Sequence, residues 1–80
     1  MRKEVRELIE GLEANRGEGW VSIDSGEGEI VDMITSAFPD LNENEIEEIA
    51  KEYEKEAIKW AEENEIEIDY NGIKGIMIKL

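Results

Sequence analysis

The sequence has 80 residues and contains no cysteine, no histidine and a single proline, Pro39. Without cysteine there are no disulfides and no thiolate chemistry. Without histidine, the usual proton shuttle of neutral pH and the usual zinc ligands are missing. No apolar run approaches the roughly 20 residues of a membrane span, and the first residues have the pattern of an amphipathic helix instead of a signal peptide. We therefore expect a cytoplasmic protein with no cofactor, no metal and no membrane partner.

Positive charge is absent from a long internal segment. Between Gly17 and Ala50 the chain has ten acidic residues and no Lys or Arg, and the whole chain carries a net charge of −13. Residues 1–16, in contrast, hold four basic and four acidic residues. Because nucleic-acid binders draw their affinity from Lys and Arg that neutralise phosphates, direct binding of nucleic acid is not expected. Either the acidity serves only solubility, or this segment presents a surface that meets a positively charged one.

Residues 41–64 form the longest periodic segment and predict a central amphipathic helix. Its buried stripe is expected to consist of residues spaced three and four apart: Ile46, Ile49, Ala50, Tyr53, Ala57, Trp60 and Ala61. Asn42, followed three residues later by Glu45, has the spacing of an N-cap in a capping box. The alternating oxygen ligands of residues 40–44 are similar to a calcium loop, but the turn glycine is missing and Lys51 stands in place of the closing Glu. We favour capping over metal binding.

Two shorter helices and one strand are expected before the central helix. Apolar residues at helical spacing predict helices over residues 2–15 and about 27–38, and the alternation of residues 20–23 predicts a strand. Asp24 or Ser25 is the expected N-cap of the second helix. The Gly-x-Gly that follows them has no Lys and is flanked by acids, so we do not expect a phosphate site there.

Residues 65–80 predict a β-hairpin with Asn71-Gly72 at the turn. A two-residue loop would place acids beside isoleucines on one face, whereas a three-residue loop, residues 70–72, separates them, so burial should select the longer loop with Gly72 left-handed. The residue pairs expected in that register are Ile66 with Ile76 and Ile68 with Lys74. One face then holds Ile66, Ile68, Ile76, Ile78 and Leu80, and the other holds Glu65, Glu67 and Asp69.

These elements predict an α+β fold for a single domain, residues 1–80, with three helices packed on a small three-stranded antiparallel sheet. The order, α-β-α-α-β-β, resembles the winged-helix arrangement, in which the third helix reads DNA and the hairpin is the wing. The resemblance covers the whole chain and is one of topology. Its functional implication conflicts with the charge, because the start of the third helix would bring its acids against phosphates of like charge.

Catalysis is not expected, because no nucleophile stands in a recognisable setting and 80 residues leave little room for a concave pocket. The main hypothesis is a binding protein whose acidic face imitates a nucleic-acid backbone and occupies the basic groove of a nuclease, glycosylase, polymerase or defence complex. In size and charge the chain resembles small acidic phage proteins, among them anti-CRISPR and anti-restriction inhibitors. The carboxylates expected to contact the basic partner are Glu27, Glu29, Asp32, Asp40, Glu43, Glu45, Glu47 and Glu48.

Two other interpretations remain open. The chain can be an interaction adaptor or a homo-oligomer subunit that binds through exposed apolar residues, with charge serving only solubility. The apolar candidates are Trp20, Ile58, Tyr70, Ile73 and Met77. The composition, rich in Glu, Lys and Ile, also fits a designed or thermophilic domain with no dedicated partner surface.

Overall fold

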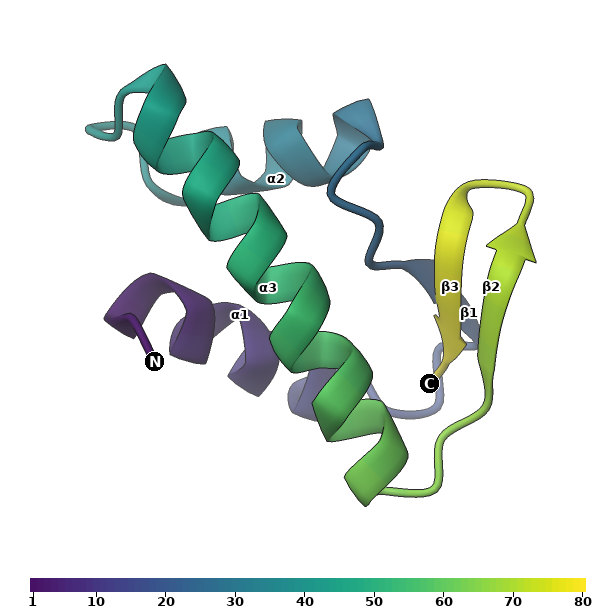
Figure 1. Ribbon diagram of the computed structural model, residues 1–80. Helices are drawn as coiled ribbons and strands as arrows, with labels where there is room; N and C mark the ends of the chain where they lie inside the picture. The colour runs from purple at the N-terminus through teal and green to yellow at the C-terminus, as the bar shows by residue number, and fades with distance from the viewer.

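The computed structural model describes residues 1–80 and confirms the predicted α+β class and the order of its elements. Figure 1 shows α3 crossing both α1 and α2, with the sheet standing beside the helices. Along the chain the elements are α1 (Lys3–Ala14), β1 (Trp20–Ser22), α2 (Gly28–Ala37), α3 (Glu43–Glu63), β2 (Ile68–Gly72) and β3 (Gly75–Lys79).

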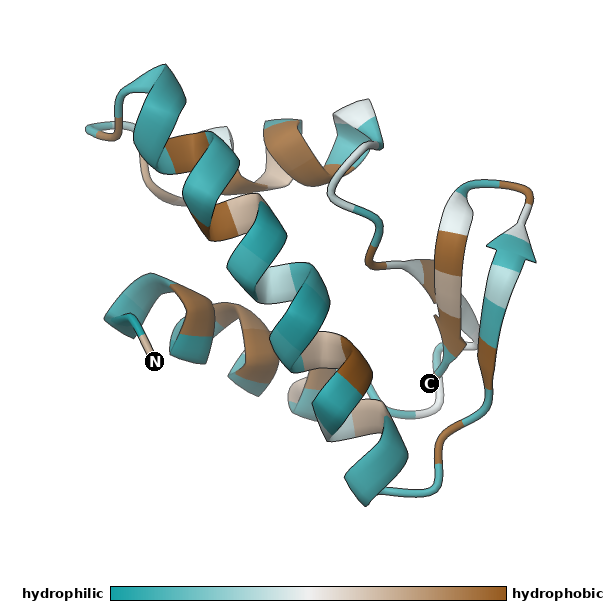
Figure 2. Cartoon of the chain, viewed as in Figure 1, coloured by the Kyte–Doolittle hydropathy of each residue, from teal (hydrophilic) through white to brown (hydrophobic).

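The helix α3 is the centre of the fold. Its predicted stripe is buried, apart from the half-buried Trp60, and Ala57 and Ala61 are completely inaccessible to solvent. Both α1 and α2 pack against it, and Figure 2 shows hydrophobic stretches alternating with hydrophilic ones along all three helices. Although α3 has 21 residues, neither it nor the other two helices combines the length and the apolar character that a membrane span requires.

The carboxyl end of α3 directs the chain toward the sheet. The N–H of Glu65 donates to the carbonyl of Glu62, and the N–H of Ile66 donates to the carbonyl of Ala61, which is the Schellman pattern of helix termination. Glu65 has a φ of 57°, a left-handed conformation that glycine usually supplies at this position. The turn allows Ile66, the next residue, to pack against the core.

The three strands form an antiparallel sheet in the order β1-β3-β2. Ile78 of β3 pairs with Val21 on one side and with Ile68 on the other, and its side chain is completely buried. The predicted separation of faces is correct. Inward-facing and partly buried against the core are Ile66, Ile68, Ile76 and Leu80, while Glu65, Glu67 and Asp69 are exposed.

The predicted position of the hairpin loop is wrong. The strands are joined through Ile73-Lys74, with Gly72 opposite Gly75, so the pairs Ile66–Ile76 and Ile68–Lys74 do not form. The glycine with positive φ is Gly75, at 74°, and not Gly72. A bulge between Asp69 and Gly72 absorbs the shift, so that the same isoleucines still face the core.

The predicted capping of α2 is also wrong, because Asp24 and Ser25 bind elsewhere. The carboxylate of Asp24 accepts hydrogen bonds from the N–H of Gly26 (2.8 Å) and from the N–H of Ile76 in β3 (3.0 Å). Ser25 donates to the carboxylate of Glu54 on α3 through both its N–H and its hydroxyl. The N-cap of α2 is therefore Glu27, with no side-chain cap, and the loop before α2 is tied to both β3 and α3.

Replacing Gly75 by Ala should lower the free energy of unfolding by about 1–2 kcal/mol from the left-handed φ alone. A β-carbon at this position would in addition meet the Asp24 carboxylate and disturb its bond to β3. Urea denaturation measures the change. Gly11→Ala is the matched control, because a β-carbon there meets nothing within 4 Å, and it should instead stabilise α1 by up to about 1 kcal/mol. A neutral Gly75→Ala would contradict the assigned turn.

Burial raises the pKa of the Tyr53 hydroxyl from 10.0 to about 12. Since the unfolded chain ionises this group first, the stability that neutral Tyr53 provides is complete below pH 10 and is lost as the pH rises toward 12. Relative to Tyr53→Phe, the free energy of unfolding of the wild type should fall by about 1.4 kcal/mol per pH unit over that window. Denaturant titrations of both proteins from pH 9 upward test this, and parallel curves would refute it.

Candidate functional site

Three of the eight carboxylates predicted to contact a partner are engaged within the fold. Glu29 pairs with Lys74 of the hairpin at 3.0 Å, and Glu48 pairs with Arg2 at 2.6 Å. Glu45 accepts from the N–H of Asn42 (3.1 Å), while its own N–H donates to the Asn42 side chain (2.9 Å), which confirms the predicted capping box. Residues far along the chain thus supply positive charge to the segment that has none of its own.

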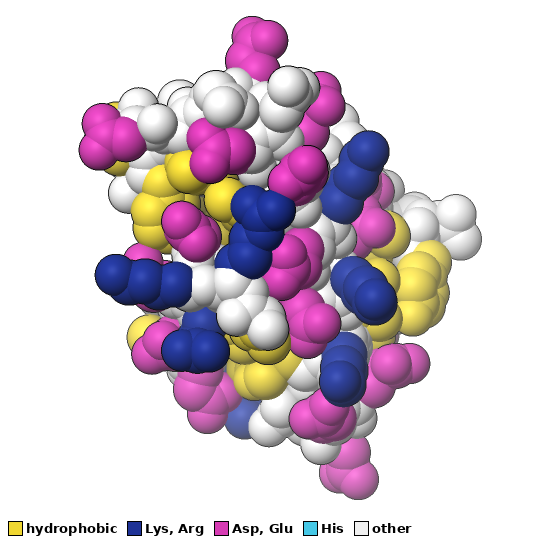
Figure 3. Space-filling view, turned by 60° about the vertical axis from the view of Figure 1, so that its left-hand side comes forward, with side chains coloured by type: hydrophobic (Ala, Val, Ile, Leu, Met, Phe, Trp, Pro, Cys, Tyr) yellow, Lys and Arg dark blue, Asp and Glu magenta, His cyan; other side chains and the backbone are white.

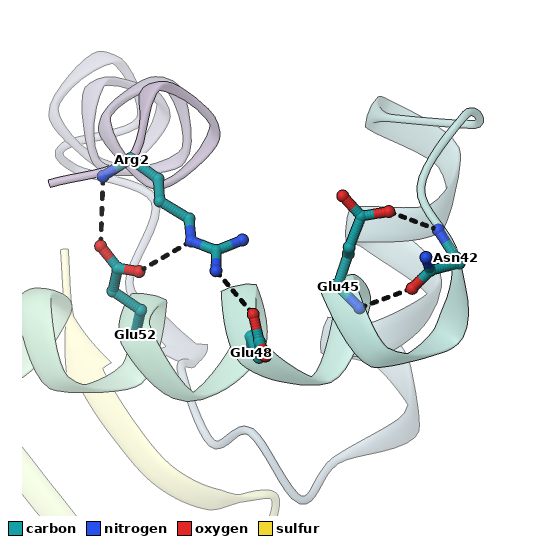
Figure 4. A network of polar contacts seen from close by, with 5 residues as sticks. All are labelled: Arg2, Asn42, Glu45, Glu48 and Glu52. Atoms are coloured by element: carbon teal, nitrogen blue, oxygen red, sulfur yellow. Dashed lines mark hydrogen bonds and ion pairs between the residues drawn. The ribbon is translucent and has the colours of Figure 1, made fainter.

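The contact of Arg2 with α3 is visible in Figure 4. Its guanidinium lies between Glu48 and Glu52, at 2.6 Å and 3.5 Å, and its backbone N–H donates to Glu52 at 3.2 Å. Glu45, one helical turn before Glu48, is occupied by the capping box (Figure 4). The carboxylates of Glu45, Glu48 and Glu52 on this side of α3 therefore all have partners within the chain and do not form a row of free negative charge.

The other five predicted carboxylates have no ion pair. Glu43 lies in the first turn of α3, where the helix dipole stabilises negative charge. Glu27 is half-buried at the start of α2. Asp32, Asp40 and Glu47 are exposed, and their carboxylates form no ion pair and accept no hydrogen bond within the chain.

Four of these residues lie between the middle of α2 and the second turn of α3, and we call them the acidic end: Asp32, Asp40, Glu43 and Glu47. Glu43 and Glu47, one helical turn apart, border a shallow hollow of about 430 Å³ whose other wall is Val31 and Thr35 of α2. The corner of α2 and α3 lies at the top of Figure 1, and in Figure 3 the topmost charged side chains are Asp and Glu, with Lys and Arg lower on the molecule.

Apolar residues form a second feature, on the other side of α2. Trp20, Ile73 and Met77, predicted as possible contacts, come together with Met33 around a hollow of about 440 Å³ between β1, α2 and the hairpin loop. Tyr70 is exposed but lies outside this hollow, and the predicted availability of Ile58 is wrong, because it is half-buried against the core.

Met33 was not among the predicted contacts. Its place beside the stripe of α2 gave no indication that the hairpin loop would come near it. The feature that brings the loop there is the bond network of Ser22, whose hydroxyl donates to the carbonyl of Lys74 at 2.8 Å, together with the ion pair of Lys74 and Glu29.

No cluster of three His, Cys, Asp or Glu side chains with the arrangement of a metal site is present. No model of a known protein family, no curated protein and no solved structure matches this chain. The two surfaces just described, the acidic end and the apolar hollow beside β1, are the basis of the proposals below.

The capping box assigns Glu45 to the fold, which can be tested through its partner. Asn42→Ala should lower the free energy of unfolding by about 1 kcal/mol, because the start of α3 loses its side-chain acceptor. Asn44→Ala, at an exposed position two residues later, is the control and should have no such cost. Equal effects of the two substitutions in urea denaturation would contradict the assigned cap.

Proposed function

We propose that the protein is a non-catalytic binding protein whose acidic end occupies a basic, nucleic-acid-binding surface of a partner protein. The observation that carries this proposal is the set Asp32, Asp40 and Glu47: three exposed carboxylates between the middle of α2 and the second turn of α3, none of which forms an ion pair within the fold. Binding is to a protein, and the acidic end replaces the nucleic acid in the partner's groove.

Electrostatics gives the physical reason. Carboxylates gathered in one place repel one another and raise the free energy of the folded state. Elsewhere the chain relieves such repulsion with cations, as at Glu48 with Arg2 and at Glu29 with Lys74. A positively charged partner surface would relieve it at the acidic end and would accelerate association through attraction at a distance.

Other roles of acidic residues explain only part of this arrangement. The dipole at the start of α3 favours Glu43, but it does not extend to Asp40 in the loop or to Asp32, which lies beyond the first turn of α2. Solubility requires net charge and does not require that several neighbouring acids lack an ion pair. Carboxylates that have no ion pair within the chain are complementary in charge to a basic groove.

Reversal of three charges tests the proposal. The immobilised wild type should capture basic nucleic-acid-binding proteins from a cell lysate, and duplex DNA added as a competitor should release them. Capture should fail with Asp32→Lys, Asp40→Lys and Glu47→Lys combined. It should also weaken steeply between about 0.02 M and 0.5 M salt, as screening shortens the range of the attraction.

A second triple variant controls for total charge. Glu10→Lys, Glu62→Lys and Glu67→Lys are exposed positions away from the acidic end, and three reversals in either protein change the net charge by six, from −13 to −7. The control should capture the same proteins as the wild type. Equal loss of capture in both variants would mean that total charge, and not the acidic end, governs binding. Release of the captured proteins by salt but not by DNA would mean that the target is not a nucleic-acid-binding surface.

A further inference from the structure

The strand β1 lies at the edge of the sheet, with β3 on one side and no strand on the other. Its hydrogen bonds to β3 use alternate residues: the N–H of Leu80 donates to the carbonyl of Gly19, and the N–H of Ile23 donates to the carbonyl of Ile76. In an antiparallel ladder the residues between these positions point their backbone groups the other way. The N–H and C=O groups of Trp20 and Ser22 therefore face away from β3, and no hydrogen bond in the chain uses them.

This free edge opens into the apolar hollow described above. The rim of the hollow is formed by Trp20, Met33, Ile73 and Met77, and its inner wall includes Leu12 and Ile30 of the helices. The rim residues are accessible, with Ile73 95% exposed, Trp20 42% and Met33 37%, whereas Ser22 is 5% exposed and lines the hollow, so a ligand reaches its backbone from within the hollow. Unpaired backbone groups beside apolar side chains form the combination that an added strand recognises, since the backbone supplies affinity and the side-chain pockets supply specificity.

We propose that an extended, cationic and apolar peptide segment of a partner binds here as a fourth strand, paired with β1 through Trp20 and Ser22. Its apolar side chains lie against Met33 and Ile73. The site is separate from the acidic end and does not depend on the function proposed for it. Because β1 has only three residues, the paired part of the ligand is short, and contacts with the rim provide the remainder of the affinity.

Charge selects this occupant over a second copy of the chain. Two copies joined edge to edge would bring together two molecules of net charge −13. A cationic segment instead meets the exposed carboxylate of Glu18, two residues before Trp20, which has no ion pair. The lining of the hollow holds one acidic side chain, Glu29, and one basic side chain, Lys74, and the two pair with each other at 3.0 Å, so the charge open to a cationic ligand is that of Glu18.

Amide hydrogen exchange with a defined probe tests the inference. The probe is a blocked eight-residue peptide of alternating lysine and valine, compared with the same peptide N-methylated throughout, which keeps the side chains and charge but loses every amide donor. Saturating probe should slow the exchange of the Trp20 and Ser22 amides at least about tenfold, and N-methylation should weaken binding by a similar factor. Equal binding of the two peptides would overturn strand pairing.

Two neutral substitutions test the apolar rim without altering charge. Met33→Gln combined with Ile73→Gln should weaken binding of the probe at least about fivefold, and Tyr70→Gln, at an exposed apolar residue outside the hollow, should leave it unchanged. Circular dichroism verifies that the variants fold, which is expected since these side chains are exposed. Equal effects at Tyr70 and at the rim would overturn the assigned site.

The same experiment separates this site from the acidic end. The variant with Asp32, Asp40 and Glu47 reversed to Lys should lose partner capture, yet the probe should still protect Trp20 and Ser22. If these amides are protected without probe, and increasingly so at higher protein concentration, the occupant is a second copy and the proposed partner segment is wrong. Protection without probe at every concentration would mean that the edge is not free.

Discussion

The burial of one stripe of α3 is the constraint on which the rest of the structure depends. Eighty residues can build only one small core, and α3 is the one helix that packs against both of the others. Ala57 and Ala61, completely buried, provide the small surface that lets neighbouring elements approach closely. Because this stripe is fully committed to the core, any interaction with a partner must use the solvent-facing sides of the helices, the loops or the edge of the sheet.

Charge is distributed in response to this packing. The fold carries Arg2 to Glu48 and Glu52, and Lys74 to Glu29, so that part of the acidic segment is compensated by residues distant in sequence. The corner of α2 and α3 receives no such cation, and the free edge of β1 receives no strand. Both features leave unsatisfied what a partner can satisfy: negative charge in one case, backbone hydrogen bonds in the other.

The elements of the fold were predictable because each depends on local pattern. Helical spacing of apolar residues places all three helices within a residue or two of their observed ends, and the Asn42 capping box follows from two residues three apart. The hairpin illustrates the limit of such reasoning. The requirement to bury apolar side chains correctly predicted which isoleucines face inward. A bulge keeps these isoleucines inward although the left-handed glycine of the loop is Gly75 and not Gly72. The choice between them depends on Asp24, which binds the N–H of Ile76 and leaves no space for a side chain at Gly75.

The sequence by itself determined the fold class, the order of the elements, the inward faces and the long segment without basic residues, because periodicity and composition are properties of neighbouring positions. Only the tertiary structure decided which acids remain uncompensated and which apolar residues share a surface. Coulomb interactions and contacts act over a few ångströms in space, whatever the separation along the chain. Thus Glu48, adjacent in sequence to Glu47, is neutralised by Arg2 while Glu47 is not, and Met33 joins Trp20 and Ile73 only because the hairpin folds back over α2.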